Sequence, residues 1–142
     1  MSNKVIVFSD STIDLTPELY ERYSIKTIPM HINLGGKMYE DNVNITTDEI
    51  FDNYYKTKEL PKTAAINSEE LIETFKPYID DGYEIVYVSL GSALSVSYRS
   101  SVLAAEELDG KLYTIDSCSL STGAGLLTIE AAIRAQQGMP AK

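Results

Sequence analysis

Three short, uninterrupted apolar runs constrain the fold of this chain more than any other feature. Residues 5–8 (Val-Ile-Val-Phe) and 85–88 (Ile-Val-Tyr-Val) are the strongest, and residues 112–115 (Leu-Tyr-Thr-Ile) are a weaker version of them. Such runs are typical of strands that are buried on both faces of a parallel sheet. Segments with helical signals lie between them. The sequence therefore predicts an α/β fold, an open and mostly parallel Rossmann-like sheet with helices on both faces.

Five segments carry helix signals. Three begin with residues that favour a helix amino-terminus, and two of these three have the spacing of a capping box. The segments are Thr16-Pro17, Thr46 with Glu49, Asn67 with Glu70, residues 95–108 and residues 121–137. The last one is apolar nearly all round, so we expect something to cover most of it.

The segment between residues 28 and 39 has a different pattern. Apolar residues alternate from Ile28 to Leu34, and Gly35-Gly36 then turns the chain back. This pattern predicts a β-hairpin. Pro29 has no N–H to donate to a strand ladder, which favours a place at the edge of the sheet.

Composition excludes several classes of function. The chain has 142 residues, the length of one domain, with 12 basic and 21 acidic side chains and a net charge of −9. Nucleic acid and anionic membranes need a basic surface, so neither is expected as a partner. Cys118 is the single cysteine and cannot form an internal disulfide. Without a signal peptide or a long apolar run, we expect no integral membrane segment and a cytoplasmic location.

Hydroxyl-rich loops follow all three predicted parallel strands. The first is Ser9–Thr12, the second is Ser89–Ser92 with Ser95 and Ser97 beyond it, and the third is Asp116–Ser119. The carboxyl ends of parallel strands lie at one edge of a sheet, where open α/β folds bind ligands. The three loops are therefore expected to converge there.

Two interpretations of this convergence stay open. Helix amino-termini and hydroxyl groups bind anions without a lysine or arginine, which predicts a neutral pocket for a carboxylate or a phosphate. Alternatively, Ser, Thr and Asp occur in these loops because they are the preferred helix caps.

No catalytic constellation is evident. His31 is the only histidine and is expected to be structural, Cys118 has no evident base, and Ser92 lacks the second glycine of a nucleophile elbow. Asp10 and Asp116 either share a metal ion or hydrogen-bond the loop backbone; we favour the second. The sequence therefore predicts no enzyme, no cofactor and no metal site.

Several segments together resemble the DegV family. They occur in the family's order over nearly the whole chain: Asp10–Leu15, Ile28–Ile32, Tyr39–Asp41, Pro61–Thr63, Leu94–Ser100 and Ile115–Gly125. Members of that family bind long-chain fatty acids and serve as the acyl-carrier subunit of bacterial fatty-acid kinase. The resemblance implies a non-catalytic carrier whose fatty acid is phosphorylated by a partner kinase.

The resemblance also implies particular site residues. In the family, a threonine and a serine hydrogen-bond the fatty-acid carboxylate, and they correspond to Thr63 and Ser95. Val96 and Ser97 replace the glycine and threonine that follow this serine, so the ligand pocket is expected to differ. The residues expected to shape the loops around the site are Asp10, Ser11, Ser92, Asp116 and Ser117.

Family members run to about twice this length, in line with a second domain of ordinary size. The resemblance implies that residues 1–142 are the amino-terminal α/β domain. The absent carboxyl-terminal domain would supply the other wall of the acyl tunnel and the surface that meets the kinase. We expect the uncovered apolar surface to favour self-association.

Two other functions stay open at this point. One is a metal-dependent phosphotransferase or hydrolase that uses Asp10 and Asp116. The other is an interaction module whose apolar last helix docks a partner.

Overall fold

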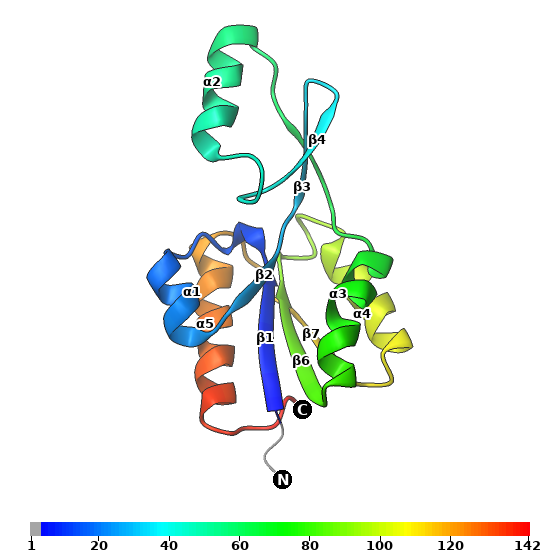
Figure 1. Cartoon of the computed structure of the whole chain (residues 1–142). Coiled ribbons are helices and arrows are strands. Elements are labelled where there is room, and N and C mark those ends of the chain that lie inside the picture. Colours follow the sequence, from blue (N-terminus) through cyan, green and yellow to red (C-terminus); the bar gives the residue numbers. More distant parts are fainter. Residues whose placement is uncertain (1–3) are drawn as a thin grey trace.

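The computed structural model describes residues 4–142 and contains two separate sheets (Figure 1). The larger sheet has four strands in the order β2-β1-β6-β7, all paired in parallel. They are β1 (Lys4–Asp10), β2 (Lys26–Ile28), β6 (Tyr83–Ser89) and β7 (Leu112–Asp116). The three apolar runs of the sequence thus form β1, β6 and β7, and the predicted α/β fold is confirmed.

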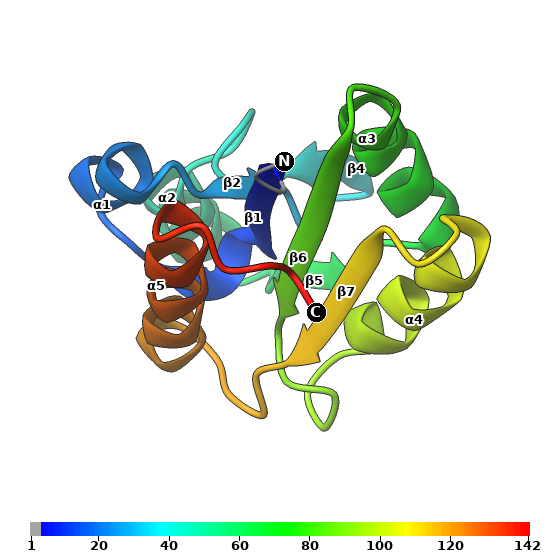
Figure 2. The same ribbon diagram turned by 90° about the horizontal axis from the view of Figure 1, so that it is seen from below.

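Helices cover both faces of the parallel sheet (Figure 2). On one face lie α1 (Pro17–Tyr23) and α5 (Thr122–Gln136), and on the other lie α3 (Ser68–Asp80) and α4 (Ser97–Glu107). Each face has its own apolar core, because successive side chains of β1 and β6 point to opposite sides. This double burial explains why the strands have continuous apolar runs rather than alternating ones.

The helix signals in the sequence correspond to the helices observed. Both capping boxes form, Thr46 with Glu49 at α2 (Thr47–Thr57) and Asn67 with Glu70 at α3. Thr16 is the N-cap of α1, although its side chain makes no capping hydrogen bond.

The hairpin forms, but its position differs from the expected edge of the main sheet. Strands β3 (His31–Leu34) and β4 (Lys37–Glu40) join β5 (Lys62–Ala64) in a small antiparallel sheet of order β4-β3-β5. The edge of the parallel sheet is instead β2, which ends at Ile28. Pro29 follows directly, and its missing N–H suits the end of a ladder.

The strand order places a topological switch point between β1 and β6. The chain moves from β1 to β2 on one side and later returns to β6 on the other. Ligands in open α/β sheets bind beyond the carboxyl ends of the strands at such a point. Figure 1 shows the antiparallel sheet and α2 standing beyond these ends, and the short 3₁₀ helix η1 (Ser11–Ile13) follows β1 there.

Part of the apolar surface stays uncovered in this chain. Strand β7 is an edge strand, and its Ile115 is exposed, as are Leu126 and Leu127 of α5. The opposite side of α5 is buried against the sheet through Ala124, Thr128 and Ala132. Helix α5 is therefore covered on one side only.

Two glycines near the start of α5 provide a stability test. A Cβ at Gly125 would lie 2.7 Å from the backbone carbonyl oxygen of Ile13. One at Gly123 would meet only the side chain of Ser119, whose Oγ can rotate away. We expect Gly125→Ala to lower the free energy of unfolding by about 1–3 kcal/mol, despite the better helix propensity of alanine. Gly123→Ala is the matched control, with a smaller loss or a gain. Urea denaturation measures both, and equal stability of Gly125→Ala and the unmodified chain would contradict the close approach.

Candidate functional site

The buried carboxylate of Asp10 connects the loops after β1 and β6. Its Oδ2 accepts a hydrogen bond from the Leu90 N–H at 2.7 Å, and its Oδ1 accepts from the backbone N–H and the hydroxyl of Thr12. One residue earlier, the Ser9 hydroxyl donates to the Val88 carbonyl at 2.6 Å. The switch point is thus closed by side-chain hydrogen bonds from the end of β1.

Asp116 connects the loops after β6 and β7. Its Oδ1 accepts from the Ser92 N–H at 3.0 Å and from the Cys118 N–H at 2.9 Å. Gly91 lies against the backbone of Ser119 and donates its N–H to the Ser119 carbonyl at 2.8 Å. A side chain at position 91 would clash with that backbone. The second and third hydroxyl-rich loops are therefore packed against each other.

The two remaining predicted loop residues also make hydrogen bonds within these loops. Ser117 is buried, and its hydroxyl donates to the Ser119 carbonyl at 3.1 Å and accepts from the Ser119 N–H at 3.1 Å. Ser92 is exposed and contributes the N–H to Asp116. These contacts hold the third loop in a compact turn.

Ser11 connects the parallel sheet with the antiparallel one. Its hydroxyl donates to Asp41 Oδ2 at 2.7 Å and accepts from the Met30 N–H at 3.1 Å. Asp41 also donates its backbone N–H to the Met30 carbonyl at 2.9 Å. Ser11 therefore fixes the base of the β3–β4 hairpin to the end of β1.

Ser95 lies just before α4 in a pair of hydroxyl groups. Its Oγ accepts from the Ser97 N–H at 3.2 Å and lies 2.9 Å from the Ser97 Oγ. Ser97 is fully buried, and its hydroxyl also contacts the Met30 sulfur at 3.9 Å. Sulfur is a weak acceptor, so the Ser97 proton can turn toward Ser95 at little cost. Ser95 can then donate its own proton to a ligand.

Thr63 lies on a different structural unit. It is exposed on β5, where it is paired with Ile32 of β3. Within residues 4–142, no hydrogen bond joins Thr63 to Ser95. The structure thus places one residue predicted to bind the carboxylate, Thr63, on the antiparallel sheet, and the other, Ser95, in the loop between β6 and α4 at the carboxyl edge of the parallel sheet.

Two cavities lie near this edge, and neither is lined by Thr63 or Ser95. One of about 540 Å³ lies between α1, the end of β2 and the segment after β4; Ser11, Tyr20 and Asp41 are among its lining residues. Another of about 300 Å³ is lined in part by His31 and Glu70.

The phenol of Tyr87 extends from the core toward Asp10. Burial, followed by the negative charge of Asp10, raises the pKa of Tyr87 well above its ordinary value of 10.0. Tyr87 is therefore neutral at physiological pH and is suited to structure rather than to proton transfer.

The contacts of Asp10 and Asp116 favour the structural interpretation of these residues. Both carboxylates accept backbone N–H bonds that fix loop shape. In the described part of the chain, no three His, Cys, Asp or Glu side chains come together in a way that suits a metal ion.

Over residues 4–142, no helix has the length and apolar character that crossing a membrane requires.

Sequence reasoning did not assign roles to three residues of this network. Asp41 and Met30 connect the sheets, and Ser97 supports Ser95. Asp41 and Met30 lie in segments that resemble the DegV family, but their partners are distant in sequence. His31, expected to be structural, directly follows Met30, which touches Ser97.

The Asp116 contacts predict acid-sensitive stability. The Ser92 side chain, followed by the Cys118 and Ser92 N–H groups, lowers the pKa of Asp116 below its ordinary value of 3.8. A carboxylate whose pKa is lower in the folded chain than in the unfolded chain stabilises the fold fully at a pH above its unfolded-state pKa. This stabilisation is lost as the pH falls through the folded-state pKa. We therefore expect Asp116→Asn to be less stable than the unmodified chain at neutral pH. The difference should disappear at a pH well below 3.8, since asparagine still accepts both N–H bonds. Thermal unfolding across this range measures it, and a constant difference would contradict the assignment.

Comparison with known proteins places this geometry in a family. The family model described as "Uncharacterised protein, DegV family" matches residues 4–142. A DegV domain-containing protein of Clostridium perfringens is 35% identical over 138 residues, which are 96% of this chain and 50% of that protein. A DegV domain-containing 15.5 kDa protein of Staphylococcus aureus is 34% identical over 86% of each chain.

Solved structures give the same result. A DegV family protein of Thermus thermophilus, described by its fatty acid binding, superimposes with a TM-score of 0.88 and 26% identity. The superposition covers 96% of this chain and 49% of that one. A hypothetical protein of Thermotoga maritima, described as revealing fatty acid binding function, has a TM-score of 0.81 and 28% identity over 97% of this chain and 51% of its own. The chain spans about half the length of most of these relatives, and it belongs to the DegV family.

Proposed function

We propose that this chain binds a long-chain fatty acid by its carboxylate and acts as a non-catalytic carrier. In this proposal Thr63 and Ser95 donate hydrogen bonds to the carboxylate. Asp10, Ser11, Ser92, Asp116 and Ser117 hold the loops in place around them. The proposal draws support from the two solved relatives described by fatty acid binding.

The observation that carries the proposal is the Ser95–Ser97 hydroxyl pair before α4. Ser97 is buried and can donate to Ser95, which leaves the Ser95 proton for a ligand oxygen. Tyr98 and Arg99 follow in the first turn of α4, where backbone N–H groups have no intrahelical acceptor. Such a site suits a negatively charged head group without requiring a cationic side chain.

The side chains beside Ser95 suit an acyl chain. Leu94 is 61% exposed and Val96 is 64% exposed, so two apolar groups flank the proposed head-group site. An acyl chain leaving Ser95 would contact them first. We propose that the second half present in the longer relatives supplies the opposite wall of the acyl site.

We further propose that a partner kinase phosphorylates the bound fatty acid. A carrier of this kind presents the head group at an accessible edge, and Ser95 is only half-buried there. An ATP-dependent partner would work in the cytoplasm, which we propose as the compartment.

The metal-dependent enzyme remains the weaker alternative. A cation held by Asp10 would compete with the hydrogen bonds that both of its oxygens accept within the loops. Metal-dependent phosphoester hydrolysis that is abolished by Asp10→Asn would favour the enzyme over the carrier.

The head-group site can be tested on the chain itself with decanoate, a soluble fatty acid. In an NMR titration of the ¹⁵N-labelled chain, we expect the amide signals of Thr63 and Ser95 to shift. Ser95→Ala and Thr63→Ala should each weaken binding about ten-fold or more, because a hydrogen bond to a charged group contributes about 1.5–3 kcal/mol. Ser100→Ala, further along α4, is the control. Unchanged affinity in both site variants would remove this site.

The chain alone should bind palmitate weakly and should self-associate. Each methylene that stays in water forfeits about 0.8 kcal/mol, so a half-covered acyl chain is held poorly. The exposed Leu126 and Leu127 should instead pair with another copy. Sedimentation velocity should show a mass that rises with concentration and falls in Leu126→Glu/Leu127→Glu. A strict monomer that binds palmitate tightly would contradict both expectations.

A further inference from the structure

The antiparallel sheet is attached to the parallel-sheet core at a narrow joint. Its β3 strand follows Pro29 and Met30, and the hydrogen bonds of Ser11 fix this base from one side. Figure 1 shows the small sheet extending away from the core beyond this point. Its own apolar cluster, Ile32, Leu34 and Ile45, is separate from the two cores of the parallel sheet. The position of the small sheet therefore depends on a few contacts at the joint.

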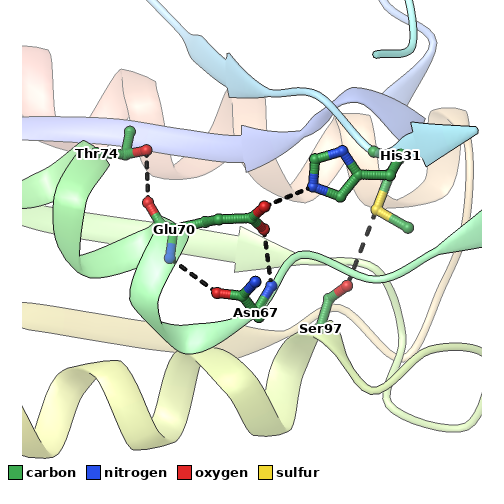
Figure 3. Close-up of polar contacts among 6 residues, drawn as sticks. His31, Asn67, Glu70, Thr74 and Ser97 are labelled. Carbon is green, nitrogen blue, oxygen red and sulfur yellow. Dashed lines mark hydrogen bonds and ion pairs between the residues drawn. The ribbon is translucent and has the colours of Figure 1, made fainter. Parts of the chain in front are cut away.

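One of these contacts joins His31 to Glu70 of α3 (Figure 3). The His31 Nε2 lies 2.8 Å from Glu70 Oε1. A carboxylate only accepts, so Nε2 carries the proton and donates. The side chains are 24% and 37% exposed, which makes this a partly shielded contact between two units.

The capping box of α3 holds the Glu70 side chain in position independently of His31. Its Oε2 accepts the Asn67 N–H at 3.1 Å, and its own N–H donates to Asn67 Oδ1 at 2.9 Å, which completes the capping box of α3. Figure 3 shows the carboxylate between Asn67 and His31. One oxygen thus caps the helix and the other receives the histidine, so the carboxylate loses little additional freedom when it binds His31.

This contact lies close to Thr63 along the backbone. His31 is paired with Ala64 of β5, and its neighbour Ile32 is paired with Thr63. Strand β5 then leads into α3 through Ile66, which is fully buried in the core. His31–Glu70 therefore closes a small ring formed by β3, β5 and the start of α3, and Thr63 lies within it.

We propose that His31 and Glu70 form a latch that fixes the antiparallel sheet on the core and thereby positions Thr63 relative to Ser95. This inference rests on the proposed fatty-acid function, because it concerns how Thr63 on the antiparallel sheet and Ser95 before α4 keep one geometry toward the carboxylate. His31 is a positioning residue in this arrangement and does not touch the ligand.

Hydrogen exchange of the 142-residue chain tests the latch without any lipid. We expect His31→Leu to speed amide exchange at residues 31–34 and 62–64 about three- to ten-fold, in keeping with a partly exposed pair. Exchange at residues 85–88 in β6 should not change. His31→Gln keeps a donor near the Nε2 position and should restore most of the protection. Lys76→Gln breaks the Lys76–Asp80 pair within α3 and is the matched control.

Glu70→Gln provides a second variant, since its amide oxygen can still cap α3. Glu40 and Glu73 line the same cavity and offer other carboxylate acceptors to His31, so we expect a smaller effect than in His31→Leu. Unchanged exchange at residues 31–34 and 62–64 in His31→Leu would overturn the latch.

Decanoate affinity tests the positioning role. His31→Leu should weaken decanoate binding by a factor similar to the change in exchange, whereas Ser95→Ala should weaken binding and leave exchange unchanged. Faster exchange with unaltered decanoate affinity in His31→Leu would overturn the positioning of Thr63. If Thr63→Ala and Ser95→Ala also bind normally, the proposed fatty-acid site fails, while the exchange data still decide the latch.

Discussion

The geometry of the carboxyl edge depends on the buried carboxylate of Asp10. A carboxylate removed from water needs several donors, and the N–H groups of Thr12 and Leu90 supply them from two loops. Ser11, the next residue, is thereby aimed at the joint of the antiparallel sheet. Beyond Leu90, Gly91 packs against the third loop. Asp10 therefore fixes the first two loops directly, and the third is joined to them through Gly91 and Asp116.

The sequence predicts the regular elements well because their signals are local. The three strands need only an apolar run, and the capping boxes of α2 and α3 need only residues three apart. The hairpin also follows from the local Gly35-Gly36 turn. The local sequence does not show that the hairpin belongs to a second sheet. That depends on the pairing of β3 with β5, about thirty residues later along the chain.

The candidate site was predicted only in part, because only some of its features have local signals in the sequence. Convergence of the serine loops follows from strand polarity alone, and Ser95 was identified both by its place before a helix and by family resemblance. Met30 and Asp41 were not assigned, and Glu70 was assigned only as a helix cap, since the contacts between the sheets join partners that are remote in sequence. His31 shows the limit most clearly. Its residue type and strand position indicate nothing about a carboxylate 39 residues away.

The wide separation of the Asp10 and Leu90 partners has a consequence for the order of folding. They lie 80 residues apart, whereas the β3–β4 hairpin pairs residues 3 to 9 apart. Closing the longer loop carries a larger entropic cost, and such contacts form late. During synthesis the hairpin can therefore form while β6 is still inside the ribosome. The carboxyl edge of the sheet, where we propose the head-group site, is assembled only afterwards. A ligand bound there would stabilise the finished fold and would not guide its early folding steps.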